Sequence, residues 1–130
     1  MRRSDREVTD LAEMEAIIRQ ADYCTLAICA ENEPYVVPLS FGYADGHVYF
    51  HGAKAGRKLE LLRRNPCVSL VFVGNCETIM GERPCIGTTL YSSVIATGIA
   101  RLVDDLDEKA RGLDILMAQH GAPGPHSYDA

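Results

Sequence analysis

Three short apolar segments follow one another within the first 51 residues, and short polar stretches separate them. They cover residues 23–29, 35–41 and 47–51, and each is rich in aromatic or β-branched side chains, which favour β-strands. Between the second and the third lies Ala44-Asp45-Gly46, and an Asp-Gly pair is typical of a hairpin turn. The first half of the chain is therefore predicted to be an antiparallel meander.

Three other segments repeat their apolar residues at helical spacing. The first helix is predicted over residues 11–20, after an aspartate that can cap it, and the second over about residues 55–64, where a proline follows. The third is predicted to begin after Asp105 and to end at Gly121. Its apolar stripe is expected to consist of Leu106, Leu113, Leu116 and Met117.

Two more strands are predicted in the second half of the chain. They cover residues 68–72 and 91–103, with Gly98 as a bulge or a site of close backbone approach in the second of them, and a loop over residues 74–87 joins them. Five strands, mostly in hairpin order with helices inserted, do not alternate regularly enough for a Rossmann sheet. The expected fold class is mainly β with α, built on a small antiparallel barrel.

The composition fits one globular domain without a nucleic-acid or membrane partner. A chain of 130 residues can bury roughly two thirds of its unfolded surface, so we expect a single domain over residues 1–130 with an irregular tail over 122–130. The net charge of −5 argues against nucleic-acid binding, which needs a basic surface. The chain lacks a membrane-length apolar stretch and a signal-peptide core, so we expect it in the cytoplasm.

The cysteines do not show the spacing of a metal site. Cys67, Cys76 and Cys85 have eight residues between neighbours, and none forms a C-x2-C pair, so structural zinc is not expected. Cys24 and Cys29 lie at an odd separation on one predicted strand and should therefore face opposite sides of it. We expect reduced, buried structural thiols and no bound metal. Hydrolase motifs are also absent from the sequence.

One segment departs strongly from the acidic character of the chain. Residues 54–64 contain five basic side chains and one acidic side chain, for a net charge of +4, whereas the rest of the chain carries −9. Three of the cations, Lys54, Arg57 and Lys58, stand at the start of a predicted helix, where the helix dipole disfavours positive charge. A phosphate bound there would remove the conflict by accepting bonds from these side chains and from the backbone N–H groups. A solvated basic face is the alternative.

The turn before this helix is not a P-loop, although it contains two glycines. Three residues separate Gly52 and Gly56, where a P-loop needs four, and leucine follows Lys58 in place of the magnesium-binding hydroxyl residue. A nucleoside triphosphatase is therefore excluded. His51 ends the third strand directly before this turn, where its ring could contact a phosphate or a planar group and donate a proton. A partly exposed histidine without a role is the alternative.

Five segments together carry a resemblance to a known family. Residues 33–43, 47–53 and 56–66 read EPYVVPLSFGY, HVYFHGA and GRKLELLRRNP. With residues 1–7 and 91–103, they closely resemble the pyridoxamine 5′-phosphate oxidase-like FMN-binding split barrels, and within these the nitroimidazole-resistance group. The resemblance covers about residues 1–121.

This resemblance implies a small antiparallel split β-barrel with peripheral helices, which forms a homodimer and binds two FMN molecules at the subunit interface. It places the strand from Val37 to Phe41 along the isoalloxazine ring, with Val37, Pro38, Leu39 and Ser40 as contacts. The third strand and its turn would approach the ring and the ribityl chain through Tyr49, Phe50, His51, Gly52 and Ala53. Lys58 matches the lysine that binds the phosphate, and Arg57 matches less closely. The partner subunit would contribute Tyr91, Ser92 and Ser93.

The sequence also departs from the family pattern at two places. Ile86-Gly87 follows Cys85 where the family has an acidic residue and a tryptophan, and the chain contains no tryptophan. Family members continue past the Gly-Pro-rich tail into another strand, whereas this sequence ends at Ala130. We therefore expect either a barrel that is short by one strand or a gap that the partner subunit covers.

The resemblance implies an FMN-dependent oxidoreductase that reduces a small planar acceptor such as a nitroaromatic compound, with His51 as the catalytic proton donor. An alternative is a non-catalytic protein in which the same barrel holds flavin or haem for sensing or storage. A dimeric structural protein with an empty cleft is a third hypothesis. Oxidation of pyridoxamine phosphate itself is not expected, because the substrate-phosphate signature of that enzyme is not found near the C-terminus.

Overall fold

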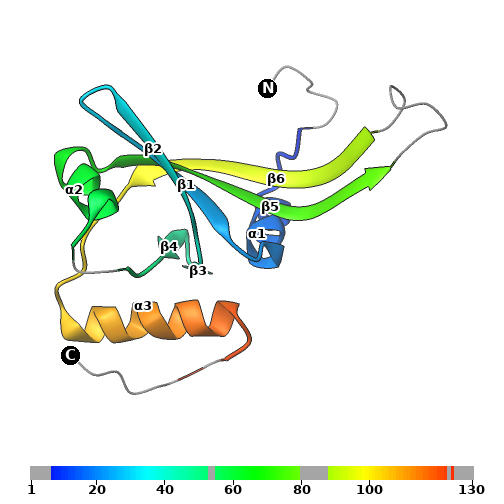
Figure 1. The fold of residues 1–130 in the computed structure, drawn as a ribbon. Helices are drawn as coiled ribbons and strands as arrows, with labels where there is room; N and C mark the ends of the chain where they lie inside the picture. The colour runs from blue at the N-terminus through cyan, green and yellow to red at the C-terminus, as the bar shows by residue number, and fades with distance from the viewer. Residues whose placement is uncertain (1–6, 53–54, 80–87, 123, 125–130) are drawn as a thin grey trace.

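The computed structural model describes residues 7–52, 55–79, 88–122 and 124, with the backbone alone over 75–79 and 88–90. Three helices and six strands form in the described residues (Figure 1). In chain order they are α1 (Leu11–Gln20), β1 (Cys24–Ala30), β2 (Glu33–Leu39), β3 (Gly42–Ala44), β4 (His47–Tyr49), α2 (Arg57–Arg64), β5 (Cys67–Ile79), β6 (Thr88–Ile99) and α3 (Leu106–Gln119). No helix in these parts of the chain is both long and apolar enough to cross a membrane.

The strands form two antiparallel sheets. The larger sheet has the order β2-β1-β5-β6, and β3 pairs only with β4 in a separate hairpin. Pro34 and Pro38 both lie in β2, an edge strand, where a missing N–H group can face away from the ladder. The expected fold class, mainly β with helices and antiparallel pairing, is confirmed. The sheets do not close into a barrel within the described residues.

Two tight turns fix the register of the hairpins. Glu31 and Asn32 join β1 to β2, and Asp45 and Gly46 join β3 to β4; all four residues have positive φ, as a type I′ turn requires. The Asp-Gly turn is thus confirmed. The predicted meander is wrong at its third strand, because β4 pairs with residues 42–44 and not with β2, the strand that the second segment forms and that ends at Leu39.

The helix starts follow their local capping signals. The Asp10 side chain accepts a hydrogen bond from Ala12 N, and the Asp105 side chain accepts one from Glu108 N. Both helices begin as predicted, because the capping residue and the amides that it binds are close neighbours in sequence. The second helix is different, because its N-cap is Gly56 and no side chain caps it.

The strands of the second half are longer or shorter than the sequence predicts. β5 continues through residues 74–79, which the prediction assigned to a loop, and residues 80–87 lie outside the described part of the chain. The register shifts between Val73 and Asn75, where the missing Cβ of Gly74 lets α1 approach: a Cβ there would lie 3.2 Å from Ile17 Cγ2. The bulge predicted at Gly98 is wrong, since Gly98 pairs regularly with Val68, and β6 ends at Ile99 instead of residue 103.

The core lies between one face of the larger sheet and the elements α1, α2 and β3. Alternate residues of β1 and β5 point into it, and Phe41 packs edge-on against Phe72 with 5.0 Å between ring centroids. Its most deeply buried side chains are Phe41, Phe72, Leu26, Leu61 and Cys24. The opposite face of the sheet is called the outer face below.

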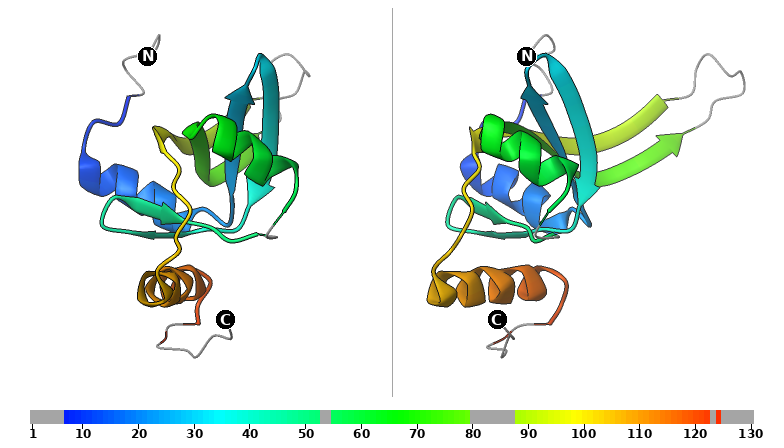
Figure 2. Two further views of the ribbon diagram at one scale, coloured as in Figure 1. Left: turned by 90° about the vertical axis from the view of Figure 1, so that its left-hand side faces the viewer. Right: turned by 60° about the vertical axis from the view of Figure 1, so that its left-hand side comes forward.

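Helix α3 docks on the β3–β4 hairpin through two glycines (Figure 2). A Cβ on Gly42 would lie 2.5 Å from the Leu116 backbone, and one on Gly112 would lie 2.8 Å from the Tyr49 ring. Because of this close approach, α3 packs against the hairpin with the side that carries Gly112 and Leu116. The predicted apolar stripe is therefore wrong as a packing face: only Leu116 of its four residues is buried, while Leu106 and Met117 are exposed.

Candidate functional site

The most chemically distinctive part of the structure is the start of α2. Gly56 precedes the helix with φ 137° and ψ 177°, and it offers no side-chain acceptor. The first backbone bond of the helix joins Glu60 N to the Gly56 carbonyl oxygen at 3.1 Å, so the N–H groups of Arg57 and Lys58 precede the helical ladder. Such unpaired N–H groups carry partial positive charge, which suits an anion.

Lys58 stands beside this helix start with its ammonium group against the end of the preceding strand. Its Nζ lies 5.8 Å from the centroid of the Phe50 ring, and a Cβ on Gly52 would come within 2.8 Å of that Nζ. Within the described residues, Lys58 forms no hydrogen bond or ion pair with an acidic side chain. We call Phe50, Gly52, Gly56 and Lys58 the basic corner. A half-buried cation with no acidic partner in the described part of the chain, next to uncapped amides, fits a phosphate monoester.

Arg57 has a different environment, although it is the neighbour of Lys58 in sequence. Its guanidinium pairs with the Glu33 carboxylate on β2 and lies 3.6 Å from the Glu60 carboxylate. The hydrogen bond to Glu33 is the main cause that raises the pKa of Arg57. Arg57 is therefore engaged by two carboxylates, while Ala53 and Lys54 lie outside the described residues.

The expected ring contacts of β2 divide between two faces. Val37 and Leu39 point inward and pack against the core, whereas Pro38 and Ser40 are exposed. At the end of β4, Tyr49 and the following Phe50 are half-buried, whereas His51 and Gly52 are exposed. The structure thus brings His51, Gly52 and Lys58 into one neighbourhood at the solvent boundary, while Val37 and Leu39 contribute to the core.

Tyr91, Ser92 and Ser93 lie elsewhere in the chain. They pair with Cys76, Asn75 and Val73 on the arm that β5 and β6 form together. This arm projects away from the body of the molecule, on the side opposite to α2 (Figures 1 and 2). A single chain therefore does not bring these residues to its own basic corner.

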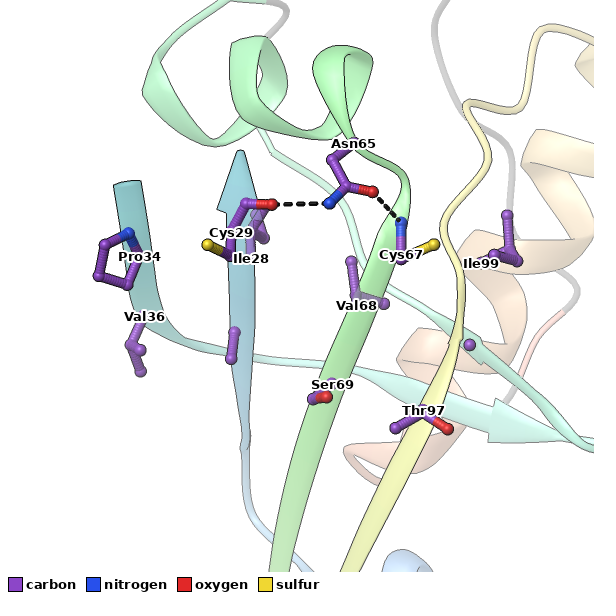
Figure 3. Close-up of a pocket in the computed structure, with 12 residues that line it drawn as sticks. Ile28, Cys29, Pro34, Val36, Asn65, Cys67, Val68, Ser69, Thr97 and Ile99 are labelled. Atoms are coloured by element: carbon purple, nitrogen blue, oxygen red, sulfur yellow. Dashed lines mark hydrogen bonds between the residues drawn. The ribbon is translucent and has the colours of Figure 1, made fainter. Parts of the chain in front are cut away.

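The outer face of the sheet holds a depression that sequence reasoning missed (Figure 3). Its volume is about 540 Å³, and its lining is mostly apolar. At one end, Asn65 Nδ2 donates to the Cys29 carbonyl oxygen at 2.7 Å, and Asn65 Oδ1 accepts from Cys67 N at 3.1 Å. The side-chain amide thereby bridges the ends of β1 and β5. The outward side chains of these two strands are small, such as Ala27 and Ser69, and form no clear apolar pattern that could have marked the depression in the sequence.

The thiols follow the two faces of the sheet. Cys24 is buried, and burial raises its pKa to about 11, whereas Cys29 and Cys67 are exposed. The prediction that Cys24 and Cys29 face opposite sides is confirmed. The expectation of buried thiols is wrong for Cys29 and Cys67, because both point to the outer face. The side chains of Cys76 and Cys85 lie outside the described residues, and those residues hold no cluster of three or more metal-binding side chains.

Comparison with known proteins gives one family and several similar folds. Residues 10–129 match the model of the family described as pyridoxamine 5′-phosphate oxidase. An uncharacterized protein of Rhizobium meliloti (strain 1021), RA0666, is 31% identical over 58 residues, which cover 45% of this chain and 38% of that relative. The alignment thus spans well under half the length of this curated relative.

Several solved structures resemble most of this chain. A candidate 5-nitroimidazole antibiotic resistance protein from Bacteroides thetaiotaomicron VPI-5482 is 32% identical with a TM-score of 0.81, over 94% of this chain and 72% of that one. A FAD-binding protein from Mesorhizobium loti is 26% identical with a TM-score of 0.63, over 86% and 75% of the two chains. A FAD- and haem-binding protein from Mycobacterium smegmatis, 18% identical with a TM-score of 0.76 over 87% and 55%, shares the fold.

Proposed function

Because this chain belongs to the pyridoxamine 5′-phosphate oxidase family, we propose that it binds FMN and reduces a small planar acceptor such as a nitroaromatic compound. The observation that carries the proposal is the basic corner, where Lys58 has no acidic partner among the described residues and stands beside uncapped amides. The similarity to the candidate nitroimidazole-resistance protein supports the class of acceptor.

The residues of the corner would hold the phosphate end of the cofactor. Lys58 Nζ and the first N–H groups of α2 would donate to phosphate oxygens. Gly52 has no Cβ, which would otherwise lie only 2.8 Å from the Lys58 ammonium. The exposed side chains of Pro38 and Ser40 would lie along the flavin ring. When bound, FMN would supply the transfer of electrons from a donor to the acceptor.

His51 is the residue placed to handle a proton in this reaction. It is exposed and lies between Phe50 and Gly52 of the basic corner, and in the proposed complex its ring would reach a planar acceptor stacked on the flavin. An imidazole can donate a proton near neutral pH. We therefore assign to His51 the protonation of the reduced acceptor.

A second copy of the chain would complete the site. Three large apolar side chains of the outer face, Val36, Ile95 and Ile99, are more than 60% exposed, and apolar patches of this kind mark interfaces. In a homodimer, the arm that carries Tyr91, Ser92 and Ser93 would extend to the partner's corner and close the flavin between subunits. The cofactor would then lie at the subunit interface.

The proposal is tested with apoprotein reconstituted with FMN. The wild type should retain the yellow chromophore through gel filtration, accept electrons from NAD(P)H or dithionite and pass them to a nitroaromatic acceptor. Lys58→Ala should bind FMN about tenfold to a hundredfold more weakly, as expected for loss of a charge-assisted bond. Lys109→Ala, on the exposed side of α3, is the matched control. A colourless wild type, or equal FMN binding by both variants, would contradict the proposal.

His51→Ala separates catalysis from binding. It should keep FMN and its reduction while lowering turnover with nitroaromatic acceptors. If turnover is unchanged with every nitroaromatic acceptor tested, His51 has no catalytic role.

The second candidate function is flavin or haem binding without catalysis. The 26% identical Mesorhizobium loti protein favours it, because that protein is described by FAD binding alone. A reduced, flavin-loaded protein that transfers no electrons to nitroaromatic compounds or quinones would support this candidate. A haem spectrum after reconstitution with haemin, in place of stable flavin binding, would support its haem form.

A further inference from the structure

Two glutamates of the β1–β2 hairpin pair with the two ends of helix α2. We propose that Glu33 and Glu31 are positioning residues that, through Arg57 and Arg64, fix α2 against the hairpin and thereby hold Lys58 at the phosphate of a bound flavin. This inference rests on the proposed function. It assigns to Arg57 a role other than the phosphate contact that the sequence predicts.

The attachments of α2 lie on one side of the helix. Arg57 and Arg64 are seven residues apart, or two turns, and Leu61 lies between them on the same side. Leu61 is fully buried, Arg57 pairs with Glu33, and Arg64 Nη1 lies 3.5 Å from Glu31 Oε2. The helix therefore has one apolar anchor at its centre and one ion pair at each end. Figure 1 shows α2 beside the hairpin that carries both glutamates.

Lys58 projects from a neighbouring side of the helix. One residue step turns the helix by about 100°, so when Arg57 faces the hairpin, Lys58 faces the segment of Phe50 and Gly52. Lys58 is three residues from Leu61, which is about 4.5 Å along the axis. A tilt of the helix about Leu61 would move the ammonium relative to β2, and the two ion pairs oppose such a tilt.

The exposure of the pairs argues against a main role in folding stability. The side chains of Arg57 and Glu33 are 39% and 52% exposed, and ion pairs at such sites contribute little to the free energy of unfolding. Their geometry is more informative than their energy. They connect β2, the strand proposed to lie along the flavin ring, to the helix proposed to hold its phosphate, and so they set the distance between these two parts of the site.

A phosphate-ligand role for Arg57 predicts a different response to substitution. Arg57 is shared by Glu33 and Glu60, and a phosphate would have to displace these carboxylates before it could bind the guanidinium. If Arg57 were such a ligand, Glu33→Gln would release it and strengthen FMN binding. If Arg57 is a positioning residue, the same change loosens α2 and weakens FMN binding.

The test compares FMN with riboflavin, which lacks the phosphate, in titrations followed by flavin fluorescence. The variants are R57E, E33R, the exchanged pair R57E/E33R, and E33Q. R63E is the matched control, because Arg63 is exposed on the same helix and forms no ion pair in the described residues. Thermal unfolding of each variant checks that it is folded.

We expect R57E to weaken FMN binding by about tenfold while riboflavin binding changes by less than about twofold. The exchanged pair should recover FMN affinity to within about threefold of the wild type, because it restores the attraction with the charges reversed. E33Q should weaken FMN binding by a few fold, and R63E should have a smaller effect than R57E.

Two results would overturn the inference. One is an exchanged pair that binds FMN no better than R57E; the other is an E33Q variant that binds FMN more tightly than the wild type. Either result would make Arg57 a direct phosphate ligand. Should R57E itself fail to fold, the E33Q result alone decides between the two roles. Failure of the wild type to bind FMN would instead contradict the proposed function.

Discussion

The two faces of the four-stranded sheet both carry large apolar residues but differ in what covers them. On the inner face, Leu26, Leu70 and Phe72 are buried beneath α1, α2 and the residues around β3. On the outer face, Ile95 and Ile99 are 76% and 71% exposed. Neighbouring positions of the same strands thus have opposite environments, because successive side chains alternate between faces.

Within the part of the chain that the structure describes, only one face of the sheet is covered. An amphipathic sheet with a solvated outer face would carry polar residues there, as antiparallel sheets commonly do. The apolar outer face of this sheet is consistent with a second copy as its cover, and this is the basis of the proposed dimer. Substitutions on the two faces and in the basic corner should therefore have different effects.

The largest effect is expected on the inner face. Phe72→Ala should lower the free energy of unfolding by about 3–5 kcal/mol, because it removes a fully buried ring and leaves a cavity. Val73→Ala, one residue further along β5 and exposed, should lower it by less than about 1 kcal/mol. Urea unfolding measures both changes in free energy, at a protein concentration below the dissociation constant of the proposed dimer. Equal losses would show that the two faces are not energetically distinct.

On the outer face, association should respond more than the stability of the single chain. Ile95→Asp should weaken dimerisation by about a hundredfold or more, because it would bury an unpaired carboxylate in the interface. Sedimentation equilibrium measures this change, with Ala12→Asp on the exposed side of α1 as the control. A dimer of unchanged strength would exclude the outer face as the interface.

Gly52→Ala isolates the basic corner from both faces. The new methyl group would lie 2.8 Å from Lys58 Nζ, which is too close. The ammonium would therefore move away, and the backbone would not be strained because the lysine side chain is flexible. FMN affinity should therefore fall by about threefold to tenfold, with a melting temperature close to that of the wild type. Isothermal titration and thermal unfolding of the same sample test this. Unchanged FMN affinity would show that the position of the ammonium is not important.

The smallest effect is a difference in thiol reactivity along β1. Cys24 should resist alkylation at neutral pH, since its pKa is raised to about 11, whereas the exposed Cys29 should react. Peptide mapping after brief treatment with iodoacetamide distinguishes the two sites. Because the thiol ionises at a higher pH when folded than when unfolded, its contribution to stability is complete below pH 9.0 and is lost as the pH rises towards 11. Rapid labelling of Cys24 would contradict its assignment to the inner face.

The sequence predicts the local features of this fold well. The three helices, two of their caps and the Asp-Gly turn depend on residues that are close in the chain, and the structure has each of them. The basic corner is also local, because Phe50, Gly52 and Lys58 lie within nine consecutive residues between β4 and the first turn of α2. Local signals therefore predict the basic corner.

Two missed features depend on contacts between residues that are distant in the sequence. The packing face of α3 follows from its close contacts at Gly42 and Gly112. The partner of Arg57 is Glu33, which is 24 positions earlier and on another element. Neither apolar periodicity nor charge patterning can identify such pairs in a single sequence.

The central claim is that two copies of this chain enclose flavin between the basic corner of one and the arm of the other. Sedimentation velocity of the FMN-reconstituted protein, recorded at a protein wavelength and at a visible flavin wavelength, tests it directly. The account predicts that both signals move together as a dimer with one FMN per chain, and that Lys58→Ala sediments as a dimer with less bound flavin than the wild type. Flavin that moves with a monomer, or a wild-type dimer that carries none, would contradict it.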